Sequence, residues 1–265
     1  MPAVAIHALA VTGDPSSTAS DLLRVIMSDP PLAAKVLRVA NSVHFHRGYN
    51  VSDLQTAIIR LGFSNVRNLL MGVAVIRSLN PYFVGAPITR EEFWVHSIAV
   101  GVTASHLSGQ SEQLCVSSSF VMGLLHDIGK LVLDRTARDG FAQALQISEG
   151  AKIPLHDAEK ARLGCDHAQV AGELLSAWKF PRELIEPVRW HHDPKKCDAA
   201  HRPHAIILQT ADWICNVHGL GNAGNRHPEA PDAAALVRLR VTGRSIASIV
   251  EAVKNEPLLN LLLPV

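Results

Sequence analysis

An adjacent histidine and aspartate, His126 and Asp127, lie inside the otherwise apolar residues 120–133. Burying an ionised carboxylate beside an imidazole is costly unless a partner, commonly a metal ion, compensates both groups. Further residues of the types that ligate divalent metals occur at a distance along the chain. They are Glu92, His96, His167, the pair His191 and His192, and Asp212. We interpret all of these residues as one polar site with a metal ion as its candidate occupant.

The spacing of these residues fits a site to which several helices contribute. Glu92 and His96 are four residues apart, so they project from one face of a helix. On a continuous helix His126 and Asp127 point about 100° apart, which suits one imidazole ligand and a carboxylate that bridges two ions. A bundle of such helices can hold two metal ions in its core. A nitrogen and oxygen ligand set without thiolate suits iron, manganese, nickel or zinc.

Each residue also has a structural explanation. A lone histidine in a helical run is more often a structural residue with a local hydrogen bond than a metal ligand. Glu92 lies three residues after Thr89, which is the capping-box pattern at a helix start. Lys130 lies three residues after Asp127, so its ammonium is expected either to reach an anion at the metal ions or to extend to the helix surface. The prediction of a metal site therefore depends on the order of all these residues along the chain and not on any single residue.

The composition is typical of a folded globular protein. The chain has 265 residues, 48% of them hydrophobic, and a mean hydropathy of +0.14. Its net charge is +1 without a dense Lys/Arg block, so we expect neither nucleic acid nor a membrane as partner. No apolar run approaches the roughly 18 residues of a membrane span, and the N-terminus lacks a signal-peptide pattern, which predicts a cytoplasmic protein. The cysteines form no CxxC pair, so we expect reduced thiols.

Hydrophobic spacing and capping residues predict an all-α fold. The Pro- and Gly-containing residues 80–87 divide the chain into an N-terminal helical subdomain, residues 1–87, and a larger helical domain, residues 88–265. In the first we expect helices near residues 16–27, 32–41, 54–61 and 65–79. In the second we expect helices near residues 90–107, 112–133, 139–148, 155–163, 166–178, 181–192 and 204–217, and two helical segments after residue 231. The β-branched residues of 204–217 leave a strand as the alternative there.

The chain resembles the HDOD proteins, bacterial regulatory domains related to the HD phosphohydrolases. The resemblance spans about residues 15–218 and rests on several motifs in order. They are residues 29–42 (DPPLAAKVLRVANS), 57–62 (AIIRLG), 93–97 (FWVHS), 123–130 (GLLHDIGK), 166–167 (DH), 178–181 (WKFP) and 190–192 (WHH). The resemblance implies an N-terminal helical subdomain packed on an HD-like helical domain.

The resemblance also implies a set of metal ligands. As in the metal-binding HD proteins, one ion would be held by His96, His126, Asp127 and Asp212. Asp127 would bridge to a second ion held by His167, His191 and His192. Glu92 matches a carboxylate that the related HD-GYP phosphodiesterases use for a third ion, and Lys130 matches the lysine that contacts substrate phosphate there. Lys130 and Asp127 are therefore the candidate catalytic residues.

The chain departs from the HD-GYP pattern after His191 and His192. Asp193 and Pro194 follow, without a Gly-Tyr-Pro sequence, which argues against recognition of a cyclic dinucleotide of that kind. We therefore expect a bacterial signal-transduction protein that keeps a dinuclear metal site and acts on a partner protein in trans or on a small phosphate-containing ligand. The alternative is an active metal-dependent phosphohydrolase or phosphodiesterase acting on a nucleotide or cyclic dinucleotide, in which two ions activate water and Lys130 neutralises phosphate charge.

Overall fold

The computed structural model describes residues 18–41, 49–79, 88–109 and 116–256. These residues form helices joined by turns and contain no strand, which confirms the all-α prediction. The chain divides into two compact units, residues 1–81 with 256–265, and residues 82–255. The expected boundary at residues 80–87 lies outside the described residues. None of the described helices is both long and apolar enough to cross a membrane.

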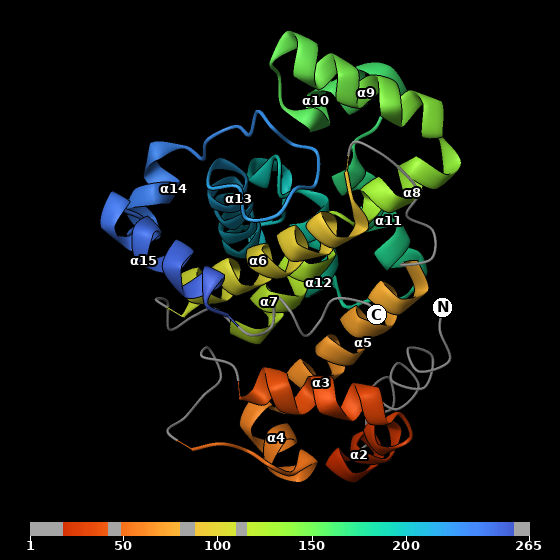
Figure 1. The fold of residues 1–265 in the computed structure, drawn as a ribbon, viewed down its shortest axis with the longest axis vertical. Helices are drawn as coiled ribbons and strands as arrows, with labels where there is room; N and C mark the ends of the chain where they lie inside the picture. The colour runs from red at the N-terminus through yellow and green to blue at the C-terminus, as the bar shows by residue number, and fades with distance from the viewer. Residues whose placement is uncertain (1–17, 42–48, 80–87, 110–115, 257–265) are drawn as a thin grey trace. The chain divides into compact units, whose positions relative to one another are not determined.

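The first unit contains α2 (Ala19–Met27), α3 (Pro30–Ala40), α4 (Leu54–Leu61) and α5 (Phe63–Leu79) (Figure 1). The Asp29 carboxylate caps α3 by accepting a hydrogen bond from the Leu32 backbone N–H at 3.0 Å. Pro30 and the proline after it occupy the first turn, where their missing N–H groups have no helical partner to lose. This helix therefore begins two residues earlier than expected. Gly62, with φ of +84°, ends α4 as the sequence indicated.

The second unit contains ten α-helices among the described residues. They are α6 (Arg90–Ser108), α7 (Val116–Leu125), α8 (Ile128–Thr136), α9 (Arg138–Ala151), α10 (Leu155–Leu163), α11 (His167–Ala177), α12 (Arg182–Arg189), α13 (Arg202–Val217), α14 (Ala233–Arg238) and α15 (Gly243–Lys254). A single 3-10 turn, η2 (Pro194–Lys196), follows α12. The segment for which a strand was the alternative is thus the helix α13.

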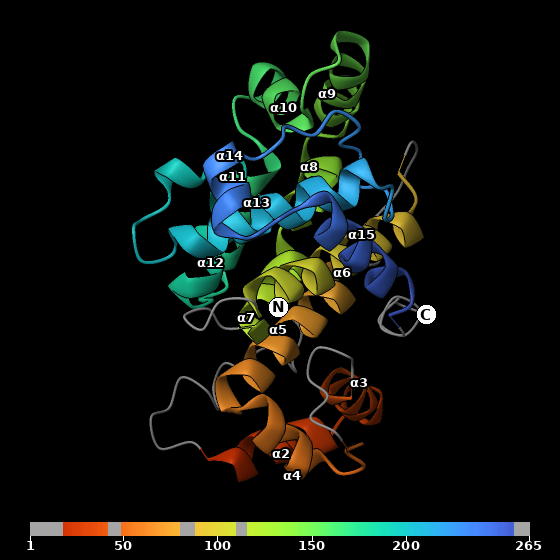
Figure 2. The same cartoon turned by 90° about the vertical axis from the view of Figure 1, so that its left-hand side faces the viewer.

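Helix α6 lies at the centre of the second unit. All residues from 93 to 108 are buried except Val95 and His106, because α7, α13 and α15 pack around this helix. Helix α7 runs beside it in both views (Figures 1 and 2). A Cβ atom on Gly123 would lie 2.4 Å from the Cα atom of Gly101. The two glycines therefore allow the two helix backbones to touch.

Helices α9 and α10 form a hairpin at one end of the second unit (Figure 2). Phe141 and Ala144 of α9 pack with Leu155 and Ala158 of α10 and with Leu133 of α8 in an apolar cluster. The side-chain oxygen of Asn225, in the loop between α13 and α14, accepts a hydrogen bond from the Leu155 N–H at 3.3 Å. This loop therefore holds the start of α10, the helix that carries His156 and Glu159.

The prediction of a single central helix over residues 112–133 is wrong. Helix α7 ends at Leu125 and α8 begins at Ile128, so His126 and Asp127 form the turn between two helices. The 100° relation of two neighbours on one helix therefore does not apply to them. The turn is closed by a 2.9 Å hydrogen bond from the Lys130 N–H to the Asp127 carbonyl. Periodicity missed the break because the residues on both sides are apolar and no proline marks it; residues 112–115 lie outside the described part.

Candidate metal centre

Seven of the predicted ligands converge inside the second unit. Their nitrogen and carboxylate oxygen atoms form three groups, each with all atoms within 4.8 Å of one another. The groups are His96, His126 and Asp127; His126, His191 and Asp212; and His167, His191 and His192. Helices α6, α11 and α13 and the turns after α7 and α12 supply these residues. All are buried except the half-buried His192.

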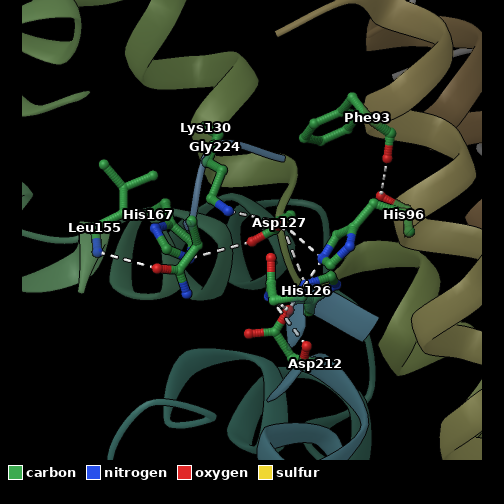
Figure 3. Close-up of polar contacts among 12 residues, drawn as sticks. Phe93, His96, His126, Asp127, Lys130, Leu155, His167, Asp212 and Gly224 are labelled. Carbon is green, nitrogen blue, oxygen red and sulfur yellow. Dashed lines mark hydrogen bonds and ion pairs between the residues drawn. The ribbon is translucent and has the colours of Figure 1, made fainter. Parts of the chain in front are cut away.

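The Asp127 carboxylate lies between two sets of imidazoles (Figure 3). Its Oδ2 atom is 3.3 Å from His126 Nε2 and 3.7 Å from His96 Nε2. Its Oδ1 atom is 3.2 Å from His167 Nε2. The two oxygens thus face different imidazoles, which is the arrangement that a carboxylate bridging two ions requires.

Backbone carbonyls orient three of the imidazoles. The Nδ1 atom of each ring is within hydrogen-bond distance of one carbonyl oxygen. The pairs are His96 with Leu220 at 3.3 Å, His126 with Gly123 at 2.7 Å and His191 with Val188 at 2.7 Å. Because a carbonyl only accepts, each Nδ1 carries a hydrogen, so Nε2 is the atom that each ring can offer to a metal ion once the ring is in its neutral form. The Nε2 atoms of His126 and His191 are buried and make no hydrogen bond. A metal ion would satisfy these lone pairs, so the residues fit the implied ions.

Glu159 is a residue of this site that the sequence analysis missed. It is fully buried on α10, and its Oε2 atom accepts hydrogen bonds from His167 Nδ1 at 2.6 Å and from the His167 backbone N–H at 2.8 Å. A carboxylate behind a ligating imidazole fixes its tautomer and raises its basicity. One sequence signal was present, because Glu159 shares a helix face with the apolar Leu155 and Ala158.

His156 was also missed, and it supports His192. The two rings stack with centroids 4.1 Å apart and an angle of 11° between their planes. On its other side, the His192 Nε2 atom is 2.9 Å from His167 Nε2. Burial lowers the pKa of both His156 and His192, which keeps their rings neutral. A neutral His192 is the form that can bind a metal ion.

Glu92 does not join the cluster. It is exposed in the first turn of α6, where its Oε2 atom accepts a 2.8 Å hydrogen bond from the Thr89 hydroxyl. The same hydroxyl accepts a 3.2 Å hydrogen bond from the Glu92 backbone N–H. Among the described residues Glu92 belongs to none of the ligand groups. The structure therefore favours the capping role of Glu92 over a role as metal ligand.

Lys130 is buried, with 3% of its surface exposed, so the surface alternative for this side chain is wrong. It lies in the first turn of α8, and its Nζ atom donates a 2.7 Å hydrogen bond to Asp127 Oδ2 (Figure 3). The ammonium therefore lies beside the carboxylate at the centre of the cluster, where it adds one positive charge to a site that contains two aspartates.

The imidazoles of the cluster differ in pKa. Burial lowers the pKa of His191 to about 3, and the charges of His126 and His167 act in the same direction. Burial also opposes ionisation of His126, but the charges and hydrogen bonds of Asp127 and Asp212 together outweigh it and raise the pKa to about 10. For His167 burial is likewise outweighed by the charge of Glu159 together with the hydrogen bonds to Asp127 and Glu159, which raise the pKa to about 9. His126 and His167 thus hold protons at neutral pH that a binding metal ion must displace.

Sequence comparison relates most of the chain to one family. The profile of the HDOD domain matches residues 1–194. A protein of Treponema pallidum (strain Nichols), described as uncharacterised, is 25% identical over 191 residues. The match covers 72% of this chain and 36% of that protein, so the chain spans little more than a third of the length of this curated relative.

Several solved structures share the fold. An HDOD domain protein of unknown function from Geobacter sulfurreducens has a TM-score of 0.75 at 23% identity, with 100% of this chain and 93% of that chain covered. A protein from Marinobacter aquaeolei VT8, described as a proposed signal transduction protein, has a TM-score of 0.72 at 25% identity, covering 98% of this chain and 57% of that chain. A proposed phosphohydrolase from Shewanella amazonensis SB2B has a TM-score of 0.69 at 20% identity, covering 99% and 92%. At these identities the likeness concerns the fold.

Proposed function

Because the chain belongs to the HDOD family, we propose that it is a bacterial signalling protein whose second unit binds two divalent transition-metal ions. The observation that carries this proposal is the pair of inward Nε2 atoms of His126 and His191, which are buried without a hydrogen bond close to Asp212. Imidazole nitrogen and carboxylate oxygen, without thiolate, suit iron, manganese, nickel or zinc.

The three ligand groups support a division of the residues between two ions. One ion would be held by His96, His126, Asp127 and Asp212. The other would be held by His167, His191 and His192, with Asp127 as the bridge. His191 belongs to a group with His126 and Asp212 as well as to the group with His167. The His191 imidazole therefore lies close to ligands of both proposed ions.

The proposed regulatory role requires a partner that acts in trans or a small phosphate-containing ligand. Family membership supports signalling, and the Marinobacter aquaeolei VT8 relative is itself described as a proposed signal transduction protein. In this role the metal ions would hold together α6, α11, α13 and the turns after α7 and α12. Binding of a phosphate-containing ligand at the ions would then change the contacts among these elements and the surface that a partner meets.

A second candidate function is metal-dependent phosphohydrolysis, and Lys130 favours it. Its buried ammonium lies 2.7 Å from the proposed bridging carboxylate of Asp127, so it is placed to offset the charge of a phosphate held at the ions. The ions, when bound, would lower the pKa of a water molecule and orient the phosphate. A nucleotide or a cyclic dinucleotide is the proposed substrate of this alternative.

Metal content and turnover together test both functions. We expect elemental analysis of protein made in metal-replete medium to give about two ions per chain, with loss of metal in His126→Ala and His167→Ala. Less than about a tenth of an ion per chain, without uptake on titration, would refute the metal site. A metal-loaded parent that hydrolyses bis-p-nitrophenyl phosphate no faster than a metal-only control supports the regulatory role. Turnover that is lost in Lys130→Ala while metal content is kept supports the hydrolase.

A further inference from the structure

The C-terminal end of α13 carries an amide that holds one of the proposed ligands. Asn216 lies four residues after Asp212, in the last turn of the helix. Its Nδ2 atom donates a 2.7 Å hydrogen bond to Asp212 Oδ1 and a 3.0 Å hydrogen bond to the Asp212 carbonyl. The same Oδ1 atom is 3.0 Å from His96 Nε2 and 3.4 Å from His126 Nε2 (Figure 3). The amide therefore holds the carboxylate with one oxygen toward two imidazoles of the site.

After Asn216 the chain turns back toward α6 in a Schellman motif. The Leu220 N–H donates to the Cys215 carbonyl at 2.9 Å, and the Gly219 N–H donates to the Asn216 carbonyl at 3.2 Å. This turn brings the Leu220 carbonyl to 3.3 Å from His96 Nδ1, where it orients the ring. The same helix end therefore contacts two of the proposed ligands, one through a side chain and one through the backbone.

Close packing fixes the turn against the start of α6. The Asn222 N–H donates a 3.1 Å hydrogen bond to the Glu92 carbonyl. A Cβ atom on Gly221 would lie 2.3 Å from the His96 backbone nitrogen and 2.6 Å from the Glu92 carbonyl oxygen. Gly221 also has a φ of +73°, a conformation that other residues rarely adopt. A glycine at this position therefore allows the Leu220 carbonyl to reach the imidazole.

A simpler role for Asn216 is that of a helix cap, because the last carbonyls of a helix lack helical partners. Asn255 at the end of α15 has this role: its Nδ2 atom donates to the Glu251 carbonyl at 3.0 Å and to Glu251 Oε1 at 2.8 Å. Both residues of that pair are exposed, and neither belongs to a ligand group among the described residues. Asn216 differs because the carboxylate that it holds faces buried imidazole nitrogens.

We propose that Asn216 is a positioning residue for a metal ion and acts together with the Leu220 carbonyl. The ion concerned is the one that His96, His126, Asp127 and Asp212 would hold. This inference rests on the proposed function. Hydrogen-bond partners behind metal ligands typically raise the affinity for metal about 10- to 100-fold. Among the described hydrogen bonds of these two groups none is with His167, so the affinity for the other ion does not depend on them.

Cobalt(II) provides two readouts on the full chain. We would load the parent and Asn216→Ala with cobalt, record the visible absorption spectrum and withdraw the ions with a chelator of known affinity. In Asn216→Ala we expect one ion to bind about 10- to 100-fold more weakly and to change its spectrum, while the other ion is unaffected. Asn255→Ala removes the same two kinds of hydrogen bond at the surface and should leave both affinities and the spectrum unchanged.

The outcomes separate this inference from the proposed function. A parent that binds two ions, with the same affinities and spectrum in Asn216→Ala, would overturn the inference while the metal site stands. Equal weakening of both ions, or the same weakening in Asn255→Ala, would also overturn it, because general loosening of the fold has that effect. A parent that binds no cobalt would overturn the proposed function and this inference with it. If Asn216→Ala does not fold, Gly221→Ala moves the Leu220 carbonyl away from His96 and should weaken the same single ion.

Discussion

Lys130 and Asp127 form a buried ion pair at the turn between α7 and α8. The Lys130 Nζ atom lies 2.7 Å from Asp127 Oδ2, and the two side chains are 3% and 1% exposed. Helix α8 starts directly after Asp127, so its first turn brings the lysine back to the carboxylate. Removal of one partner from a buried pair leaves the other charge without compensation, which typically costs about 3–5 kcal/mol.

The first prediction compares Asp127→Ala with Glu92→Ala. We expect Asp127→Ala to lower the free energy of unfolding by about 3–5 kcal/mol, because Lys130 keeps an unpaired buried charge. Glu92→Ala should cost about 1 kcal/mol or less, because it loses an exposed helix cap. Urea denaturation of both variants, with and without metal, measures the difference. Equal losses would contradict a structural role of the buried pair. In the double variant Asp127→Asn with Lys130→Met we expect part of the stability to return.

The second prediction concerns Glu159 as a positioning residue. Glu159→Gln keeps the size of the side chain and removes the charge behind His167, so we expect the affinity for metal to fall about 10- to 100-fold. Competition with a chelator of known affinity measures this change. Glu173→Gln is the matched control, because Glu173 lies on the same helix as His167 and pairs on the surface with Arg189. If the two variants bind metal equally well, Glu159 has only a structural role.

The sequence predicted those helix ends that depend on a nearby capping residue. Asp166 accepts a hydrogen bond from the Gln169 N–H at 2.8 Å and starts α11, as its position as a capping residue indicated. The break at His126 was missed because the hydrogen bonds that close this turn become visible only in the folded chain. The seven residues that converge in the site were expected because their order along the chain resembles that of the HD proteins. Glu159 and His156 were not expected, because their burial depends on how the hairpin of α9 and α10 packs.

The third prediction uses a contact between two helices. A Cβ atom on Gly129 in α8 would lie 1.9 Å from the carbonyl oxygen of His167 in α11. Gly129→Ala must therefore push the two helices apart, and we expect a loss of about 1–3 kcal/mol together with weaker metal binding. Gly150→Ala in α9 is the control, because no atom lies within 4 Å of the added methyl group. Alanine should stabilise that helix by up to about 1 kcal/mol. Thermal melts of the two variants should shift in opposite directions.

The last prediction is that stabilisation by metal grows between pH 6.5 and pH 9. In the folded protein without metal, the pKa of His126 is raised to about 10 and that of His167 to about 9, from the ordinary value of 6.5. Their ion pairs therefore stabilise the metal-free fold fully below about pH 6.5, and this stabilisation is lost as the pH rises through 9 to 10. Metal binding needs the neutral rings, so proton competition weakens as the pH rises.

Two measurements check this pH dependence. The increase in Tm on addition of manganese should be larger at pH 9 than at pH 6.5, and filling of the site near pH 7.5 should release about two protons into a weakly buffered solution. His126→Asn should bind less metal and release about one proton fewer. A gain in Tm that is the same at every pH, without proton release, would mean that the added metal binds elsewhere on the chain. Release of two protons on metal binding would therefore show that the metal binds at His126 and His167, the two imidazoles that are charged in the metal-free protein.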